Sequence, residues 1–328
     1  MGDWQDLANI PTQMKLRSAT TRFKSRSGHS GTGQVGLAGL GLMGMALARK
    51  LIEGGFGVWG CDLDRERVRA FRQLGGITAP NAAGIAVRCP RIVLSLPDSR
   101  AVKTVLAEMG PHLARGQVIV DTSTGDPAAA REAGRTLVRR GIHYLDATIS
   151  GSSSQVLRQE VIVLVGGSAV ACSACRDIFR LFARKFFFLG PFGHGSKMKL
   201  VSNLVLGLNR AALAEGLFFG TRLGLNSRLV LQILRESMAY SRIMDTKGEK
   251  MIEADFTPQA KLSQHLKDVR LILAAGARAG VKLPLSQTHR QLLERAEVEG
   301  CGGLDNSAII CAFQRLSAVP RRRRKERS

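Results

Sequence analysis

The sequence predicts a doubly wound α/β domain that a long helix links to an all-α region. In the first half, short β-rich segments alternate with segments of helical periodicity, which end in glycine as helices commonly do. Such alternation is typical of a mostly parallel sheet with helices on both faces. From about residue 195 onward, every apolar segment has helical rather than strand periodicity. The chain has 328 residues, enough for two such parts at about 150 residues each.

Seven segments of the first half are predicted to be strands. They are 34–39, 57–62, 91–96, 117–121, 142–147, 161–167 and 185–190. Segments such as "MALARKLIEGG" and "PAAAREAGRTLVRRG" lie between them and have the spacing of helices. We therefore expect an α/β domain over residues 34–194.

One long helix is predicted over about residues 195–224, followed by further helices to residue 316. Its sequence, "KMKLVSNLVLGLNRAALAEGLFFGTRLGL", is apolar on nearly every side. A helix that is apolar all round must be buried all round, within the molecule or against a partner subunit. The later segments "SRLVLQILRESM", "LSQHLKDVRLILAAGARAG" and "SQTHRQLLERAEVEG" complete the all-helical region.

The net charge of +22 is partly concentrated at the two ends of the chain. Residues 1–33 are predicted to be a disordered basic extension, and residues 317–328, with "PRRRRKERS", a basic disordered tail. Such runs bind polyanions weakly and without specificity. We interpret them as solvated tails, which makes nucleic acid an unfavoured partner.

The sequence does not indicate a membrane span, a secretory signal or a metal site. No apolar stretch reaches the ~18 residues of a membrane span, and the N-terminus has no secretory h-region. Six scattered cysteines, with a lone "CSAC", and six histidines without metal spacing predict no metal site. Scattered thiols fit a reducing compartment, so we predict a cytoplasmic location, or the mitochondrial matrix in a eukaryote.

A dinucleotide site is predicted where "GLAGLGLMG" closes the first strand and opens a helix. Gly39 permits the tight turn, Gly41 lets the backbone approach a pyrophosphate, and Gly44 allows close helix–strand packing. The N–H groups of the helix start would face the phosphates. This part of the site comprises Gly39, Leu40, Gly41, Leu42, Met43 and Gly44.

Asp62 ends the second strand at about the ~20-residue spacing of an acid that binds the ribose hydroxyls of NAD. A carboxylate there repels a 2′-phosphate, so NAD is favoured. Arg65 and Arg67 lie just beyond and keep NADP as an alternative. Together, the glycines and the acid indicate a Rossmann-type domain.

Further motifs follow in a recognisable order. They are "LSLPD" (94–98), "DTSTGDP" (121–127), "LDATISGSSS" (145–154), "GHGSKMKLVSN" (193–203), "HLKDVRLIL" (265–273) and "GGLDNSAII" (302–310). With the glycine motif, they make residues 34–315 resemble the β-hydroxyacid dehydrogenases. This family includes 3-hydroxyisobutyrate dehydrogenase, tartronate semialdehyde reductase and the N-terminal, NAD-binding region of 6-phosphogluconate dehydrogenase.

The resemblance implies reversible hydride transfer between NAD(P) and the alcohol carbon of a small hydroxy acid, or a semialdehyde in reverse. It implies that Lys199 is the general acid/base and that Asn203 orients it or the reacting oxygen. It also implies a homodimer or homotetramer. The substrate-binding residues that it implies are Ser123, Ser150, Gly151, Ser152 and Lys267. Residues near the nicotinamide would be Leu96, Pro97, Thr124 and again Lys267.

Helix geometry independently separates the two lysines of "GSKMKLVSN". Lys199 and Asn203 are four residues apart and share one helix face. Lys197 lies about 200° around the helix from Lys199. A buried lysine has a lowered pKa and can exchange protons near neutral pH.

Several positions depart from the family pattern or have a purely structural alternative. Ser202 replaces an asparagine, Thr148 a proline, and Ser152 a glycine. Hydroxyls at 152–154 would suit a more polyhydroxylated acid. Ser123 and Thr124 could instead cap the following helix, Lys267–Asp268 could be a solvated pair, and Asp305 is expected to be an N-cap.

Two other functions remain alternatives. One is a non-catalytic, nucleic-acid-associated member of the same fold, suggested by the basic tails. The other is an imine reductase on the same scaffold. The lysine at position 199 favours the dehydrogenase over both.

Overall fold

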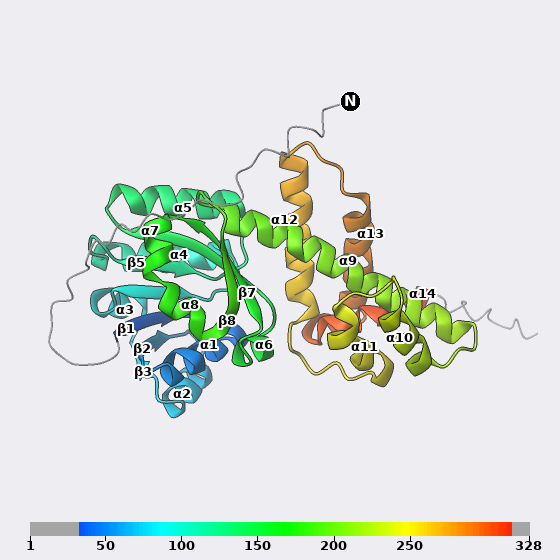
Figure 1. The fold of residues 1–328 in the computed structure, drawn as a ribbon. Helices are drawn as coiled ribbons and strands as arrows, with labels where there is room; N and C mark the ends of the chain where they lie inside the picture. The colour runs from blue at the N-terminus through cyan, green and yellow to red at the C-terminus, as the bar shows by residue number, and fades with distance from the viewer. Residues whose placement is uncertain (1–32, 317–328) are drawn as a thin grey trace, which may run out of the picture. The chain divides into compact units, whose positions relative to one another are not determined.

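The computed structural model describes residues 33–316, and its first half is an eight-stranded sheet (Figure 1). The strand order is β3-β2-β1-β4-β5-β6-β7-β8, and neighbours are parallel except for the antiparallel β6–β7 pair. The strands are β1 (Gln34–Ala38), β2 (Gly57–Cys61), β3 (Ile77–Thr78), β4 (Arg91–Leu94), β5 (Val118–Asp121), β6 (His143–Ser150), β7 (Val161–Gly167) and β8 (Ala183–Phe188).

All seven predicted strands are confirmed. The short edge strand β3 was not predicted, because two residues cannot show a periodicity. The predicted extension and tail fall almost wholly on residues 1–32 and 317–328, which lie outside the described residues.

Helices cover both faces of the sheet, as doubly wound folds require. In β4, Val93 packs into a cluster with Leu47 and Phe179, whereas Ile92 belongs to a second cluster with Ile85. Alternate residues of one strand therefore enter two cores, which explains its continuous apolar run. The flanking helices are α1 (Leu42–Glu53), α2 (Arg65–Gln73), α3 (Ala82–Arg88), α4 (Ser99–Met109), η2 (Gly110–His112), α5 (Pro127–Arg139), α6 (Ser153–Leu157), α7 (Ala169–Ala174) and α8 (Arg176–Phe182).

Helix α9 (His194–Arg222) leads from the sheet into the helical region. The helices after it pack into a third core around Leu217, Leu266 and Leu293. Among the described residues, no helix combines the length and the hydrophobicity that a membrane span needs. The remaining helices are α10 (Ser227–Glu236), α11 (Ile243–Glu253), α12 (Leu262–Arg278), α13 (Pro284–Val298), η3 (Cys301–Gly303), η4 (Asn306–Ile309) and α14 (Ile310–Leu316).

The burial of α9 within one chain is incomplete, which leaves burial against a partner subunit as the remaining predicted alternative. One side packs against the sheet and the later helices, but Val201, Val205 and Phe219 are 55%, 52% and 61% exposed. Within one chain the helix is therefore not buried all round, because no element of the described chain covers that side. The apolar sequence pattern alone could not distinguish a fully buried helix from one with an open apolar stripe.

The first turn of α9 is held on the sheet by Asp146 of β6. Its carboxylate accepts hydrogen bonds from the backbone N–H groups of Gly193 at 3.0 Å and Ser196 at 2.8 Å. A side chain at Gly195 would overlap the backbone oxygens of Asp146 and Leu164. The helix backbone therefore lies directly against β6 and β7, which sets the position of every residue in the following turns.

This close approach gives a stability prediction for two glycines of α9. We expect Gly195→Ala to destabilise the protein by about 1–3 kcal/mol, because the added methyl group meets backbone atoms that cannot move away. Gly216, on the same helix, has no atom within 4 Å of an added Cβ. We expect Gly216→Ala to be neutral or stabilising by up to about 1 kcal/mol. Thermal unfolding followed by circular dichroism measures both, and equal effects of the two variants would contradict the close packing.

Candidate active site

Three glycines shape the turn between β1 and α1 in different ways. Gly39 has φ +95°, and a side chain there would overlap the backbone oxygen of Ser95. One at Gly44 would overlap the backbone oxygen of Gly39. At Gly41 the nearest atom to an added Cβ is Nη1 of Arg67, 3.9 Å away. Gly39 and Gly44 therefore serve the turn and the packing, whereas Gly41 faces open space.

The start of α1 fits a dinucleotide phosphate. No side chain caps the helix at Gly41, and its first turn contains no acidic residue. Uncapped N–H groups and the positive end of the helix dipole favour an anion. Leu42, Met43 and Gly44 provide the backbone of this first turn, beside the open space at Gly41.

Asp62 follows β2 and supports the glycine turn. Its Oδ2 accepts a 2.7 Å hydrogen bond from the N–H of Leu40, and its Oδ1 accepts one from Asp64 at 2.9 Å. Arg67 lies 3.6 Å from Oδ2 and also pairs with Asp64 at 3.2 Å. The arginine noted in the sequence is therefore engaged with two carboxylates.

Lys267 of α12 joins the loops after β4 and β5. Its Nζ donates to the backbone oxygens of Pro97 and Thr124, each at 2.8 Å. The N–H of Leu96 donates to Oγ of Ser123 at 2.9 Å. These contacts bring together the residues that the resemblance placed near the nicotinamide. The Lys267–Asp268 pair is not a solvated pair, since Asp268 is buried.

Neither Ser123 nor Thr124 caps α5, which removes the structural alternative left open for these two residues. Asp126 is the N-cap, and its carboxylate accepts from the N–H of Ala128. The hydroxyl of Ser123 instead accepts the hydrogen bond from Leu96. The sequence could not decide this, because three of the four residues before Pro127 have side chains that can cap a helix.

Lys199 is 7% exposed, whereas Lys197, two residues earlier, is exposed. Burial lowers the pKa of Lys199 to about 8; the charge of Asp268 opposes this shift and that of Lys267 adds to it. Asn203, one turn later, donates from Nδ2 to Asp268 at 2.9 Å. The ammonium of Lys199 makes no hydrogen bond to the described residues. A partly neutral, unbonded amine of this kind can accept and return a proton near neutral pH.

Burial raises the pKa of Asp268, while the charges of Lys267 and Lys199 oppose the shift. Its carboxylate lies 3.2 Å from Nζ of Lys267 and accepts from Asn203. Sequence reasoning treated Asp268 only as a partner of Lys267. Its link to Asn203 joins α9 to α12 and depends on tertiary packing, so no local pattern shows it.

The segment after β6 is shaped by a helix cap. Gly151 has φ +147°, and Ser152 forms a capping box with Gln155 at the start of α6. Oγ of Ser152 also lies 2.9 Å from Oγ of Ser154. The hydroxyl of Ser152 is thus engaged within the segment, and Ser150, at the end of β6, is the half-buried hydroxyl that precedes it.

Thr148 stands where the family pattern has a proline, and its side chain makes a contact that proline could not make. It is fully buried on β6, and its hydroxyl donates to the backbone oxygen of Gly195 at 3.1 Å. A proline could not make this bond. The substitution therefore adds a second tie between β6 and the first turn of α9.

Two buried features of the helical region were missed or only partly predicted. Asp305 is the predicted N-cap, of η4, and it also forms an ion pair with buried Lys247 at 2.8 Å. Arg210 is 2% exposed, and its Nε and Nη1 have no hydrogen-bond partner in the described part of the chain. An arginine within the apolar run of α9 was the available signal. Within residues 33–316, no cluster of three metal-ligating side chains is present.

Two family models together match most of the described chain. Residues 34–190 match the family model for the NAD binding domain of 6-phosphogluconate dehydrogenase. Residues 193–313 match the model described as "NAD-binding of NADP-dependent 3-hydroxyisobutyrate dehydrogenase".

Similar curated proteins cover most of the chain. L-threonate dehydrogenase of Cupriavidus necator is 30% identical, covering 85% of this chain and 95% of its own. 2-(Hydroxymethyl)glutarate dehydrogenase of Eubacterium barkeri is 31% identical over 87% of this chain and 96% of its own. A crystal structure of 3-hydroxyisobutyrate dehydrogenase from Salmonella typhimurium superposes with a TM-score of 0.79 at 25% identity, covering 86% of this chain and 100% of its own.

The burial of Lys199 gives a stability prediction. A lysine whose pKa is lowered to about 8 costs the folded state about 3 kcal/mol, fully present below pH 8 and relieved as the pH rises toward 10.5. We expect Lys199→Met to raise the free energy of unfolding at neutral pH by up to that amount. Exposed Lys197→Met should change it by less than about 0.5 kcal/mol. Urea unfolding of both variants measures this, and a destabilised Lys199→Met protein would contradict it.

Proposed function

Because the chain belongs to the β-hydroxyacid dehydrogenase family, we propose that it transfers a hydride between NAD(P) and the alcohol carbon of a small hydroxy acid, with Lys199 as general acid/base. The observation that carries the role of Lys199 is its burial next to Asn203 and Asp268, with a pKa lowered to about 8. Near neutral pH such a lysine is available in both protonation states.

The residues of this chain would each handle part of the reaction. In oxidation, the neutral amine of Lys199 takes the proton from the substrate hydroxyl, and in reduction its ammonium returns one. Asp268 holds the amide of Asn203 in one orientation, so that its oxygen can orient the amine or the reacting hydroxyl. When bound, the nicotinamide supplies the hydride acceptor or donor, which makes a metal unnecessary.

The substrate carboxylate is proposed to bind at Ser123 and along Ser150, Gly151 and Ser152. The capping box of Ser152 and Gln155 holds the backbone of Ser152 in place. The hydroxyls of this segment, and the names of relatives that act on threonate and hydroxymethylglutarate, support a polar small acid. Candidates also include a 3-hydroxyisobutyrate-like acid and tartronate semialdehyde in the reverse direction.

The alternatives gain less support. A non-catalytic, nucleic-acid-associated member would have no need for a buried lysine with a lowered pKa, and an imine reductase typically has another residue there. The open apolar stripe of α9, with Val201, Val205 and Phe219, supports self-association into a homodimer or homotetramer. Cys61, Cys89, Cys172, Cys175 and Cys301 are free thiols, which supports a reducing compartment.

Activity measurements test the role of Lys199. Hydroxy acids are screened with NAD and NADP by nicotinamide absorbance. We expect Lys199→Met to lower kcat by about 10²–10⁴-fold, the range for loss of a general acid/base. For the wild type, kcat/KM of oxidation should rise with pH and level off above about 8, where the amine is neutral, and that of reduction should fall above the same pH.

Lys197→Met is the matched control, since it makes the same change two residues away on the exposed side. It should keep wild-type turnover and the same pH profile. If Lys197→Met were inactive and Lys199→Met active, the assignment of the general acid/base would be wrong.

Asp62 predicts a preference for NAD. Its carboxylate borders the glycine turn and would repel a 2′-phosphate. We expect Asp62→Asn, which keeps the hydrogen-bond acceptor but removes the charge, to reduce the ratio of kcat/KM for NAD over NADP by about tenfold. Asp64→Asn is the control, because Asn also caps helices. An unchanged ratio in Asp62→Asn would contradict a role in cofactor choice.

A further inference from the structure

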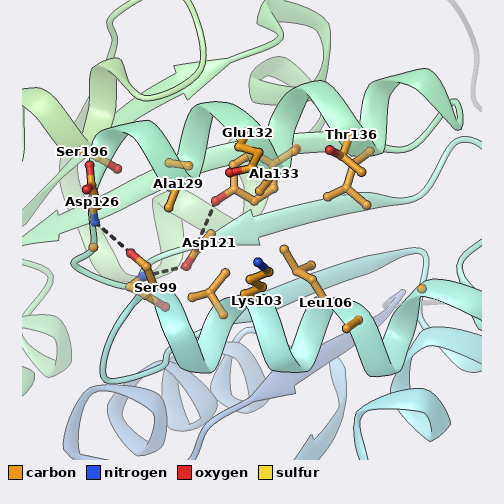
Figure 2. Close-up of a pocket in the computed structure, with 18 of the residues that line it drawn as sticks. Ser99, Lys103, Leu106, Asp121, Asp126, Ala129, Glu132, Ala133, Thr136 and Ser196 are labelled. Carbon is orange, nitrogen blue, oxygen red and sulfur yellow. Dashed lines mark hydrogen bonds between the residues drawn. The ribbon is translucent and has the colours of Figure 1, made fainter.

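A cavity of about 620 Å³ lies between α4 and α5, above β5 and β6 (Figure 2). The glycine turn, Lys199 and Asn203 do not line it. It shares with the proposed active site only the loop after β5, through Ser123, and the first turn of α9, through Ser196. The space therefore adjoins the proposed substrate site at Ser123 but does not include Lys199 or the glycine turn.

Hydrogen bonds join α4 and α5 at both ends, and the cavity separates the two helices in the middle. At one end the N–H of Asp126 donates to Oγ of Ser99 at 2.8 Å, and at the other Nη2 of Arg140 donates to the backbone oxygen of Gly110 at 2.7 Å. Between these bonds, α5 lines the cavity with three alanines, Ala129, Ala130 and Ala133, and with the larger Glu132, Thr136 and Leu137. Tied ends and small side chains make this a built space rather than a packing defect.

The floor of the cavity carries the carboxyl group of Asp121, which Figure 2 shows between the two helices. It is 6% exposed and accepts hydrogen bonds from Oη of Tyr144 at 2.8 Å and from the N–H of Ser123 at 2.9 Å. No basic side chain of the described residues pairs with it. A buried carboxylate without a counter-ion is costly, and the nearby Asp146 adds negative charge.

We propose that this cavity binds a small organic cation, a primary amine with an apolar body. The ammonium would lie beside Asp121, where it supplies the missing counter-ion and donates to the remaining lone pairs of the carboxylate. The apolar body would pack between Val102 and Leu106 of α4 and the alanines of α5.

The other charged groups around the cavity do not offset this preference. Arg140 donates to Gly110, and Asp126 pairs with Arg278 at 3.0 Å. Lys103 on α4 and Glu132 on α5 are exposed and of opposite sign. An anionic ligand would meet Asp121 at the floor, with the charge of Asp146 close by, and a neutral ligand would leave the Asp121 carboxylate without a counter-charge. The lining groups with charge are Asp121, Lys103, Asp126, Glu132 and Arg140.

Calorimetric titration of the full chain tests the proposal with three matched probes: 4-phenylbutylamine, 4-phenylbutanol and 4-phenylbutyrate. We expect one amine to bind per chain, the alcohol to bind about tenfold or more weakly, and the carboxylate weakest. Burial, with a smaller contribution from Asp146, raises the pKa of Asp121 to about 6. Amine binding should therefore weaken as the pH falls through 6, where Asp121 becomes protonated.

Two variants fill the cavity from opposite walls, Ala133→Phe on α5 and Leu106→Trp on α4. Each should weaken amine binding at least about tenfold without altering hydroxy acid turnover. Ala128→Phe is the matched control, because Ala128 is exposed on α5 and does not line the cavity. The proposal is overturned if amine and alcohol bind equally, if no probe binds, or if a folded cavity-filling variant binds the amine like Ala128→Phe.

Discussion

The carboxylate of Asp146 is the contact on which the geometry of the proposed active site depends. It accepts two backbone N–H groups at the start of α9, each bond to a charged acceptor contributing about 1.5–3 kcal/mol. Thr148 adds a third bond from the same strand to the same turn. Because Lys199 lies one turn further along a stiff helix, its position follows from where that first turn meets the sheet.

Burial of the Lys199 ammonium opposes stability and, at the same time, favours the general acid/base role that we propose for it. Desolvation lowers its pKa toward the range in which one group can both accept and donate a proton. Asp268 limits the shift, and its own pKa is raised by the same lack of water. The folded chain thus holds a charge that it would be more stable without, which is common where a protein binds or reacts.

Lys267 has a different task from Lys199, although both are lysines close to Asp268. Its ammonium donates hydrogen bonds to the backbone oxygens of Pro97 and Thr124. Lys267 therefore connects α12 to two loops at the carboxyl ends of parallel strands. These strand ends are where doubly wound sheets bind their ligands. A contact of this kind would let the helical region influence the shape of the proposed cofactor site.

The sequence by itself determined the fold class, seven of the eight strands and the glycine turn, because each has a local signal: alternation, periodicity, or glycines at fixed spacing. It also separated Lys199 from Lys197, since two residues on a helix point to different sides. Tertiary structure decided the rest. The bond of Asn203 to Asp268, the cap by Asp126, the open side of α9 and the cavity above Asp121 all depend on which elements meet. Contacts between residues far apart in the chain leave no pattern in either segment alone, so only the folded molecule specifies them.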